Sequence, residues 1–179
     1  FNGTRTLNLG GNSTWTANYI YAGGGSILKI EPTATLTNTA NATLHGSYYG
    51  GVTTIVNNQG NFTKSTATGT TDILAVFNNS GTVNVQTGTL DFSAGGTSTG
   101  IANVSANATL QLSGGNFTFD NNSQITGAGS VKVAGGTAIF TGNNTGSANI
   151  IISGGTATFN GTTNTTGGGT FSGGTLGGT

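Results

Sequence analysis

The chain has no cysteine, no methionine and very little charge. The lack of cysteine excludes disulfides and thiol chemistry, and it suits a protein that is exported unfolded. Four basic and four acidic residues balance to a net charge of zero, too little positive charge to bind nucleic acid or a membrane surface. No apolar run approaches the ~20 residues of a membrane span, so we expect no membrane insertion.

Glycine, threonine, asparagine and serine dominate instead, and they occur in a repeat. Four ten-residue blocks share an alternating apolar triplet, a small residue, Gly-Gly and a second short alternating run. The blocks cover residues 110–119, 131–140, 150–159 and 169–178. A period of about 20 residues with strand-type alternation is typical of a β-solenoid, in which each repeat forms one coil. Because one short repeat cannot bury an apolar face alone, coils must stack on coils.

Alternation predicts which side chains of these coils face inward. We expect Phe119, Phe140 and Phe159 to form one interior column, with rings stacked at the strand spacing of about 4.8 Å. Phe92, Val133 and Ile152 complete the predicted core ladder. The paired glycines fit a corner because glycine accepts a positive φ.

Two earlier segments extend the pattern. Residues 55–62 return 21 residues later as 76–83, which predicts asparagine ladders between Asn57 and Asn78 and between Asn58 and Asn79. Residues 83–92 resemble the C-terminal block but lie 27 residues before Leu110. This interpretation requires an insertion in that coil, which we place within Ser93–Gly100.

We therefore predict an all-β fold, a single-stranded right-handed parallel β-helix (β-solenoid) with about 19–21 residues per coil. One domain would cover residues 1–179, with less regular, aromatic-rich coils in 1–50 and regular coils in 51–179. Eight or nine coils give a rod about 40 Å long. The right hand follows from the strong preference of parallel crossovers.

One stretch resembles a known family. Residues 127–145, with Ile152-Ser153-Gly154-Gly155-Thr156, are similar to the autotransporter-associated β-strand repeat and to haemagglutinin-type passengers of bacterial surface proteins. The resemblance covers about residues 80–179, although the aromatic residue expected after Asn144 is absent. It implies a secreted right-handed β-helix of adhesins, autotransporter passengers or extracellular fibres.

The titratable residues predict no chemistry. The acids Glu31, Asp72, Asp91 and Asp120 are far apart in sequence, and Asp91 is interpreted as a lone exposed carboxylate. His45 has no nearby cysteine, aspartate or second histidine, which favours a surface histidine over a ligand or a triad member. We therefore predict no catalytic residue, no metal site and no cofactor, and we expect the protein not to be an enzyme.

Aromatic residues near the N-terminus are the strongest candidate contact site. Aromatic rings stack on sugars and anchor protein interfaces, but these side chains could equally cap the core. The candidates are Trp15, Tyr19, Tyr21, Tyr48 and Tyr49. Frequent Thr-x-Thr pairs also suggest ice binding, but the aligned copies keep only half of that pattern.

These observations predict a structural β-solenoid of a bacterial extracellular fibre or surface adhesin, located outside the cell or on its surface. The last block stays in register to Thr179 without a polar cap, which favours either further repeats of a longer chain or head-to-tail stacking of copies. Surface glycans are additional candidate partners. The alternative is a carbohydrate-binding module or polysaccharide-active β-helix that uses the tyrosines and Trp15.

Overall fold

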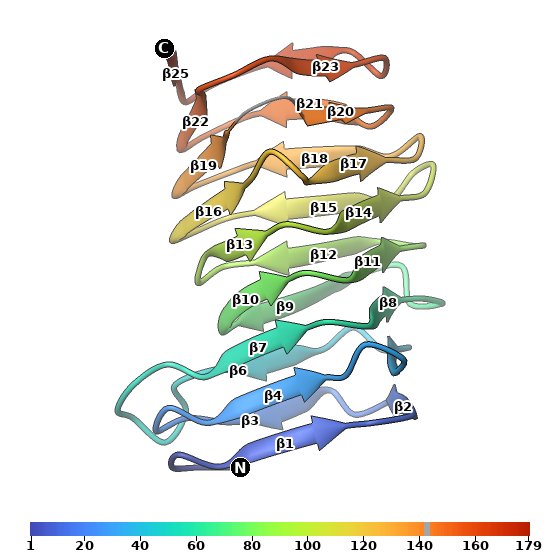
Figure 1. Ribbon diagram of the computed structural model, residues 1–179, viewed down its shortest axis with the longest axis vertical. Helices are drawn as coiled ribbons and strands as arrows, with labels where there is room; N and C mark the ends of the chain where they lie inside the picture. Colours follow the sequence, from blue (N-terminus) through green and yellow to red (C-terminus); the bar gives the residue numbers. More distant parts are fainter. Residues whose placement is uncertain (142–143) are drawn as a thin grey trace.

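The computed structural model is a β-solenoid, and it describes residues 1–141 and 144–179. These residues contain 25 strands and no helix (Figure 1). The strands form three parallel sheets, and each complete coil contributes one strand to each sheet. The predicted all-β solenoid is confirmed, and its coils have three faces.

Sheet A begins each coil, and its strands pair in parallel in chain order. Its described strands are β1 (Thr6–Leu9), β4 (Ile27–Ile30), β7 (Ile55–Asn58), β10 (Val76–Asn79), β13 (Gly96–Ser98), β16 (Asn116–Phe119), β19 (Thr137–Phe140), β22 (Thr156–Phe159) and β25 (Thr175–Gly178).

Sheet B follows after the first corner of each coil. Its described strands are β2 (Asn12–Trp15), β5 (Thr35–Asn38), β8 (Asn61–Lys64), β11 (Thr82–Val85), β14 (Ile101–Val104), β17 (Gln124–Thr126), β20 (Asn144–Gly146) and β23 (Thr163–Thr165).

Sheet C closes each coil before the chain returns to sheet A. Its described strands are β3 (Tyr19–Tyr21), β6 (Thr43–His45), β9 (Thr70–Leu74), β12 (Thr89–Phe92), β15 (Thr109–Leu112), β18 (Ser130–Val133), β21 (Asn149–Ile152) and β24 (Gly169–Phe171).

The coil is right-handed. In Figure 1 the chain climbs from the N-terminus to the C-terminus, with the near strands β1, β4, β7 and β10 pointing right and the fainter, distant strands of sheet C pointing left. A chain that ascends in this sense turns as a right-handed helix. This agrees with the preference of parallel crossovers for the right hand.

The predicted phenylalanine column is present in sheet A. Phe119 pairs with Phe140 and Phe140 with Phe159 in register. The ring centroids are 5.1 Å and 4.7 Å apart, and both interplanar angles are 7°. Alternation thus placed these side chains correctly, and each ring packs on the ring of the next coil.

Phe92 belongs to the core but to a different column. It lies in sheet C, in register with Leu112 and then with Val133 and Ile152. Its ring nevertheless stacks between those of Phe77 and Phe117, at 4.3 Å and 5.5 Å. Between Phe77 and Phe117 the sheet A column holds a glycine, so the ring of Phe92 from the neighbouring sheet occupies the interior at that level.

The Gly-Gly corners join sheet C to sheet A. The second glycine of each corner has a positive φ, which is +61° at Gly136. A Cβ built on Gly136 would lie 2.3 Å from the carbonyl oxygen of Gly115 in the corner one coil away. The corners therefore need glycine both for backbone conformation and because stacked corners approach closely.

Both predicted asparagine ladders are confirmed. Facing inward, Asn58 Nδ2 donates to Asn79 Oδ1 at 2.7 Å, and Asn79 Nδ2 donates to Ser98 Oγ at 3.2 Å. Facing outward, Asn78 Nδ2 donates to Asn57 Oδ1 at 3.2 Å. Because each coil repeats the same side chain at the same place, an amide finds its partner one coil away.

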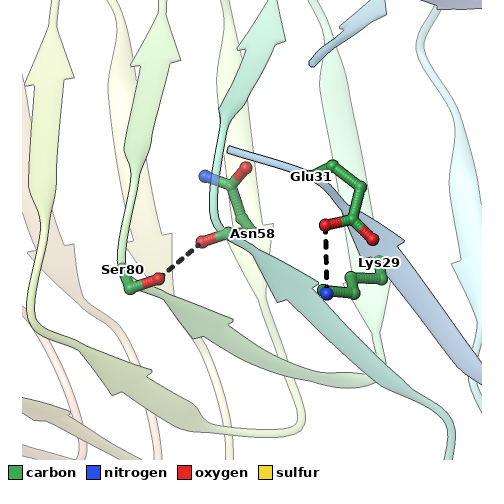
Figure 2. A network of polar contacts seen from close by, with 4 residues as sticks. All are labelled: Lys29, Glu31, Asn58 and Ser80. Carbon is green, nitrogen blue, oxygen red and sulfur yellow. Dashed lines mark hydrogen bonds and ion pairs between the residues drawn. The ribbon is translucent and has the colours of Figure 1, made fainter. Parts of the chain in front are cut away.

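Figure 2 shows two polar contacts near the ends of β4, β7 and β10. Ser80 Oγ donates to the backbone oxygen of Asn58 at 3.5 Å. On β4, Lys29 Nζ lies 3.0 Å from Glu31 Oε2. This ion pair joins two partly exposed side chains, so it contributes little to stability.

The predicted insertion within Ser93–Gly100 is wrong. Thr89–Phe92 pairs directly with Thr109–Leu112, and residues 93–95 form an ordinary three-residue corner before β13. The resemblance of residues 83–92 to the C-terminal block pairs a corner between sheets B and C with a corner between sheets C and A, and these are different corners of the coil. The longer connection is the nine-residue segment 46–54 between β6 and β7, which we call the inserted loop.

Candidate functional site

A pair of exposed tyrosines on β3 begins the candidate site. Tyr19 and Tyr21 flank Ile20, so strand alternation turns both rings outward from sheet C. Their exposed fractions are 54% and 37%. The ring centroids lie 5.6 Å apart with an interplanar angle of 19°, so the two rings form a stacked pair on the outer surface.

His45 on the next coil extends this pair. Parallel register places His45 beside Tyr21, and the two rings stack at 5.2 Å with an angle of 15°. The sequence prediction of an isolated surface histidine missed this contact. Aligning the inward residues Ile20 and Leu44 would have revealed it, because the residues that follow each of them, Tyr21 and His45, then become neighbours.

The inserted loop adds two more rings. Tyr48 lies 4.2 Å from Tyr21 by ring centroids, and Tyr49 meets Tyr48 edge-on at 5.1 Å. Tyr48 and Tyr49 are 59% and 51% exposed. We refer to Tyr19, Tyr21, His45, Tyr48 and Tyr49 as the tyrosine cluster.

Backbone hydrogen bonds hold the inserted loop against the preceding coil. The amide of Tyr48 donates to the carbonyl of Ala22 at 2.9 Å. The amide of Gly24 donates to Gly50 at 3.0 Å, and that of Gly25 donates to Val52 at 2.7 Å. The positions of Tyr48 and Tyr49 are therefore set by the fold before any ligand arrives.

Trp15 does not join the cluster. It is the last residue of β2, faces inward and is 4% exposed. Its indole packs in the hydrophobic core, and the buried Nε1 has no hydrogen-bond partner. The prediction of a surface contact at Trp15 is wrong because the strand alternation of β2 turns this side chain into the coil, where the core interpretation fits.

A polar hollow of about 370 Å³ adjoins Tyr19. Asparagine, threonine and aspartate side chains supply most of its wall. Its lining residues are Asn18, Tyr19, Asn41, Ala42, Thr43, Thr70 and Asp72. Tyr19 thus belongs to both the tyrosine cluster and the hollow.

Two of the acids are neighbours, which corrects the interpretation of Asp91 as a lone exposed carboxylate. Asp72 and Asp91 are register partners on β9 and β12. Asp91 is 7% exposed, and its Oδ2 accepts a 2.9 Å hydrogen bond from Gln111 Nε2. Ser93 Oγ donates to Asp72 Oδ1.

Burial raises the pKa of the Asp91 carboxyl, and the neighbouring charge of Asp72 acts in the same direction. The hydrogen bond from Gln111 opposes the rise. The repeat hides this pair, because aligning residues 83–92 with the C-terminal block places Asp91 opposite residues of sheet A instead of Asp72 in sheet C. Each acid is followed by an inward apolar residue, Ile73 after Asp72 and Phe92 after Asp91. Because Ile73 and Phe92 are register partners, aligning them would have predicted that the two acids are neighbours.

Within residues 1–141 and 144–179, no group of three or more histidine, cysteine, aspartate or glutamate side chains is arranged to hold a metal ion. The same residues include no helix that is long and apolar enough to span a membrane. No family model, curated protein or solved structure matches the chain.

Proposed function

We propose that this chain is a non-enzymatic structural β-solenoid of a bacterial extracellular fibre or surface adhesin, and that its coils join end to end by strand stacking. The observation that carries the proposal is the continuous parallel pairing of strands from coil to coil. In each sheet, every described strand pairs in parallel with the strand of the next coil. A rod built this way transmits load through backbone hydrogen bonds along its whole length.

The described strands at the C-terminal end support stacking on a further coil. Phe171 on β24 and Leu176 on β25 are 62% and 58% exposed, and in register with buried core residues of the preceding coil. A strand edge with exposed apolar side chains is a template for another strand. The next coil would belong either to the same polypeptide or to another copy.

The composition supports an extracellular location. Without cysteine the chain folds independently of redox conditions, and it relies on asparagine and threonine rather than charge for its polar surface. Its sequence resemblance to secreted bacterial repeats points in the same direction.

Electron microscopy and light scattering of the purified chain test the proposal. We expect rods longer than the ~40 Å of eight stacked coils, formed in a concentration-dependent way. Leu176→Lys should suppress association, since a charge at the edge opposes strand pairing. The matched control Ile101→Lys changes a 38% exposed apolar residue on the side of the rod and should leave association unchanged. Compact monomers at every concentration would contradict end-to-end stacking.

A further inference from the structure

The tyrosine cluster faces sideways from the first two coils, because its residues come from β3, which is the outermost strand of sheet C, from β6 and from the inserted loop. In Figure 1 these strands lie on the distant face, and the loop between β6 and β7 projects sideways. A stack of coils would leave this face open. The cluster is therefore available to a partner whether or not the proposed end-to-end association occurs.

Exposed rings are unusual on this face of the rod. Beyond Tyr19 the same outward column continues with Thr43, Asp72, Asp91 and Gln111, all of them polar. Aromatic side chains that gather on an otherwise polar surface mark a site of interaction. The nine-residue inserted loop, anchored by hydrogen bonds to the preceding coil, adds two of these rings to the site.

The ring geometry provides flat apolar surfaces that meet at an angle. The ring planes of Tyr21 and His45 are nearly parallel, with an angle of 15° between them, whereas those of Tyr48 and Tyr49 are nearly perpendicular, at 87°. A pyranose ring has an apolar face of C–H groups, and such a face packs on an aromatic ring. Its equatorial hydroxyls then point sideways and need hydrogen-bond partners.

The polar hollow supplies such partners directly beside Tyr19. Asn18, Asn41, Thr43 and Thr70 offer amide and hydroxyl groups that both donate and accept hydrogen bonds. The volume of about 370 Å³ falls within the range of about 300–1,000 Å³ that is usual for small-ligand sites. A ring-stacking surface that continues into uncharged hydrogen-bonding side chains fits a saccharide better than an apolar peptide.

The charges of the hollow select among saccharides. Asp72 lines it, and Asp91 lies beside Asp72 on the next coil. The lining residues include no lysine or arginine. Uronate, sulfate or phosphate groups would be repelled by the carboxylate of Asp72, with no cation in the wall to offset the repulsion.

We propose that the tyrosine cluster and the polar hollow together form a binding site for a neutral saccharide, with Tyr19 joining the stacking surface to the hydrogen-bonding wall. Tyr19 and, on the loop, Tyr49 supply stacking, and Tyr21 supports the neighbouring rings against which it packs. The hollow binds hydroxyls, and Asp72 excludes acidic sugars.

An array of neutral and uronate oligosaccharides, followed by calorimetry with the complete chain, tests this site. We expect binding to at least one neutral hexasaccharide and at least tenfold weaker binding to the uronate of the same linkage. Tyr19→Ala and, on the loop, Tyr49→Ala should each weaken binding at least tenfold. Both residues are exposed, so circular dichroism should show an unchanged fold. Ile101→Ala, an exposed apolar residue on β14 of sheet B, is the matched control and should bind normally.

Asp72→Asn tests the selectivity separately, since it keeps the shape of the side chain and removes its charge. It should reduce the discrimination against uronates. The absence of binding to every neutral saccharide at millimolar concentration would overturn the proposal, as would binding that survives both tyrosine substitutions. Measurements at concentrations where the chain is monomeric keep this result independent of fibre assembly.

Discussion

At the scale of single residues, the fold depends on whether a polar side chain faces into the coil or out of it. Asn78 and Asn79 are adjacent on β10, yet Asn79 is buried and Asn78 lies on the outer face. Both make ladder hydrogen bonds. Their contributions should differ, because an unpaired amide or carbonyl is costly only where water cannot reach it.

Asn79→Ala should therefore lower the free energy of unfolding by about 2–3 kcal/mol, since it leaves Asn58 Nδ2 and the hydroxyl of Ser98 with fewer partners inside the coil. The same change at Asn78 should cost less than about 1 kcal/mol. Urea denaturation of the two variants measures both values. Equal losses would show that the ladders do not depend on burial.

The carboxyl of Asp91 makes stability depend on pH. Its pKa is raised above the ordinary value of 3.8, so the folded state binds the proton more tightly than the unfolded state. The resulting destabilisation is absent below pH 3.8 and grows as the pH rises through the folded-state pKa.

Asp91→Asn should thus raise the melting temperature at pH 7 and have little effect at pH 3. The asparagine oxygen still accepts the hydrogen bond from Gln111. Asp120→Asn provides a control at a partly exposed acid. A gain from Asp91→Asn that is the same at both pH values would refute this explanation.

Lys64, the last residue of β8 in sheet B, places its amino group inside the coil. The residue is fully buried, and Nζ donates to the carbonyl of Ala67 at 3.0 Å. Burial lowers the pKa of Lys64 below 10.5. For a base this means that the unfolded state binds the proton more tightly, so the penalty is complete at neutral pH and disappears as the pH rises past 10.5.

Lys64→Met should therefore stabilise the protein at pH 7, by about 1 kcal/mol. The carbonyl of Ala67 keeps a partner, because Thr87 Oγ1 also donates to it at 3.0 Å. Thermal melts between pH 7 and pH 10.5 should show the advantage shrinking. Destabilisation at pH 7 would contradict this prediction. It would mean that the interactions of the Lys64 side chain in the coil contribute more to stability than the burial of its charged amino group costs.

At the scale of elements, the corners restrict the sequence most strongly. Gly136→Ala should lower stability by more than the ~1–3 kcal/mol of an unfavourable backbone conformation, because its Cβ would also meet the carbonyl oxygen of Gly115. Gly10, at the corner between β1 and β2, has open space around the position of a Cβ. Gly10→Ala is therefore the matched control, and denaturation should show no loss.

The strands of the C-terminal coils were predictable because their repeat is close to perfect. The alternation around Phe119, Phe140 and Phe159 determined both the inward face and the register. The same alternation misled the alignment of residues 83–92, because all three sheets present apolar pairs between short corners. No residue type in the repeat is specific to one sheet, so a strand–corner–strand segment from one corner of the coil can be aligned with a segment from another corner.

The candidate site was only partly predictable. Composition pointed to Tyr19, Tyr21, Tyr48 and Tyr49, and the structure brings their rings together. Trp15 was included because sequence proximity does not distinguish the two sides of a strand. His45 and Asp72 were missed because their neighbours come from other coils, and the irregular spacing of the first coils hides that register.

At the scale of the whole molecule, one arrangement explains the ladders, the ring stacks and the side-facing cluster. Each requires that a residue lie directly above its counterpart in the preceding coil. The fibre proposal extends this stacking beyond one chain, and the saccharide proposal requires it only locally, between β3, β6 and β9. All of them therefore depend on the register between coils.

Disulfide formation measures that register most directly, since the chain has no cysteine of its own. Thr118→Cys with Ile139→Cys joins two outward positions that are partners across β16 and β19. Their Cα atoms lie at the strand spacing of about 4.8 Å, which a disulfide can span. The control pair, Thr118→Cys with Lys132→Cys, places the second cysteine on sheet C. We predict complete, rapid crosslinking of the first pair and none within the control monomer; crosslinking of the control, or failure of the first pair, would contradict the stacked coils.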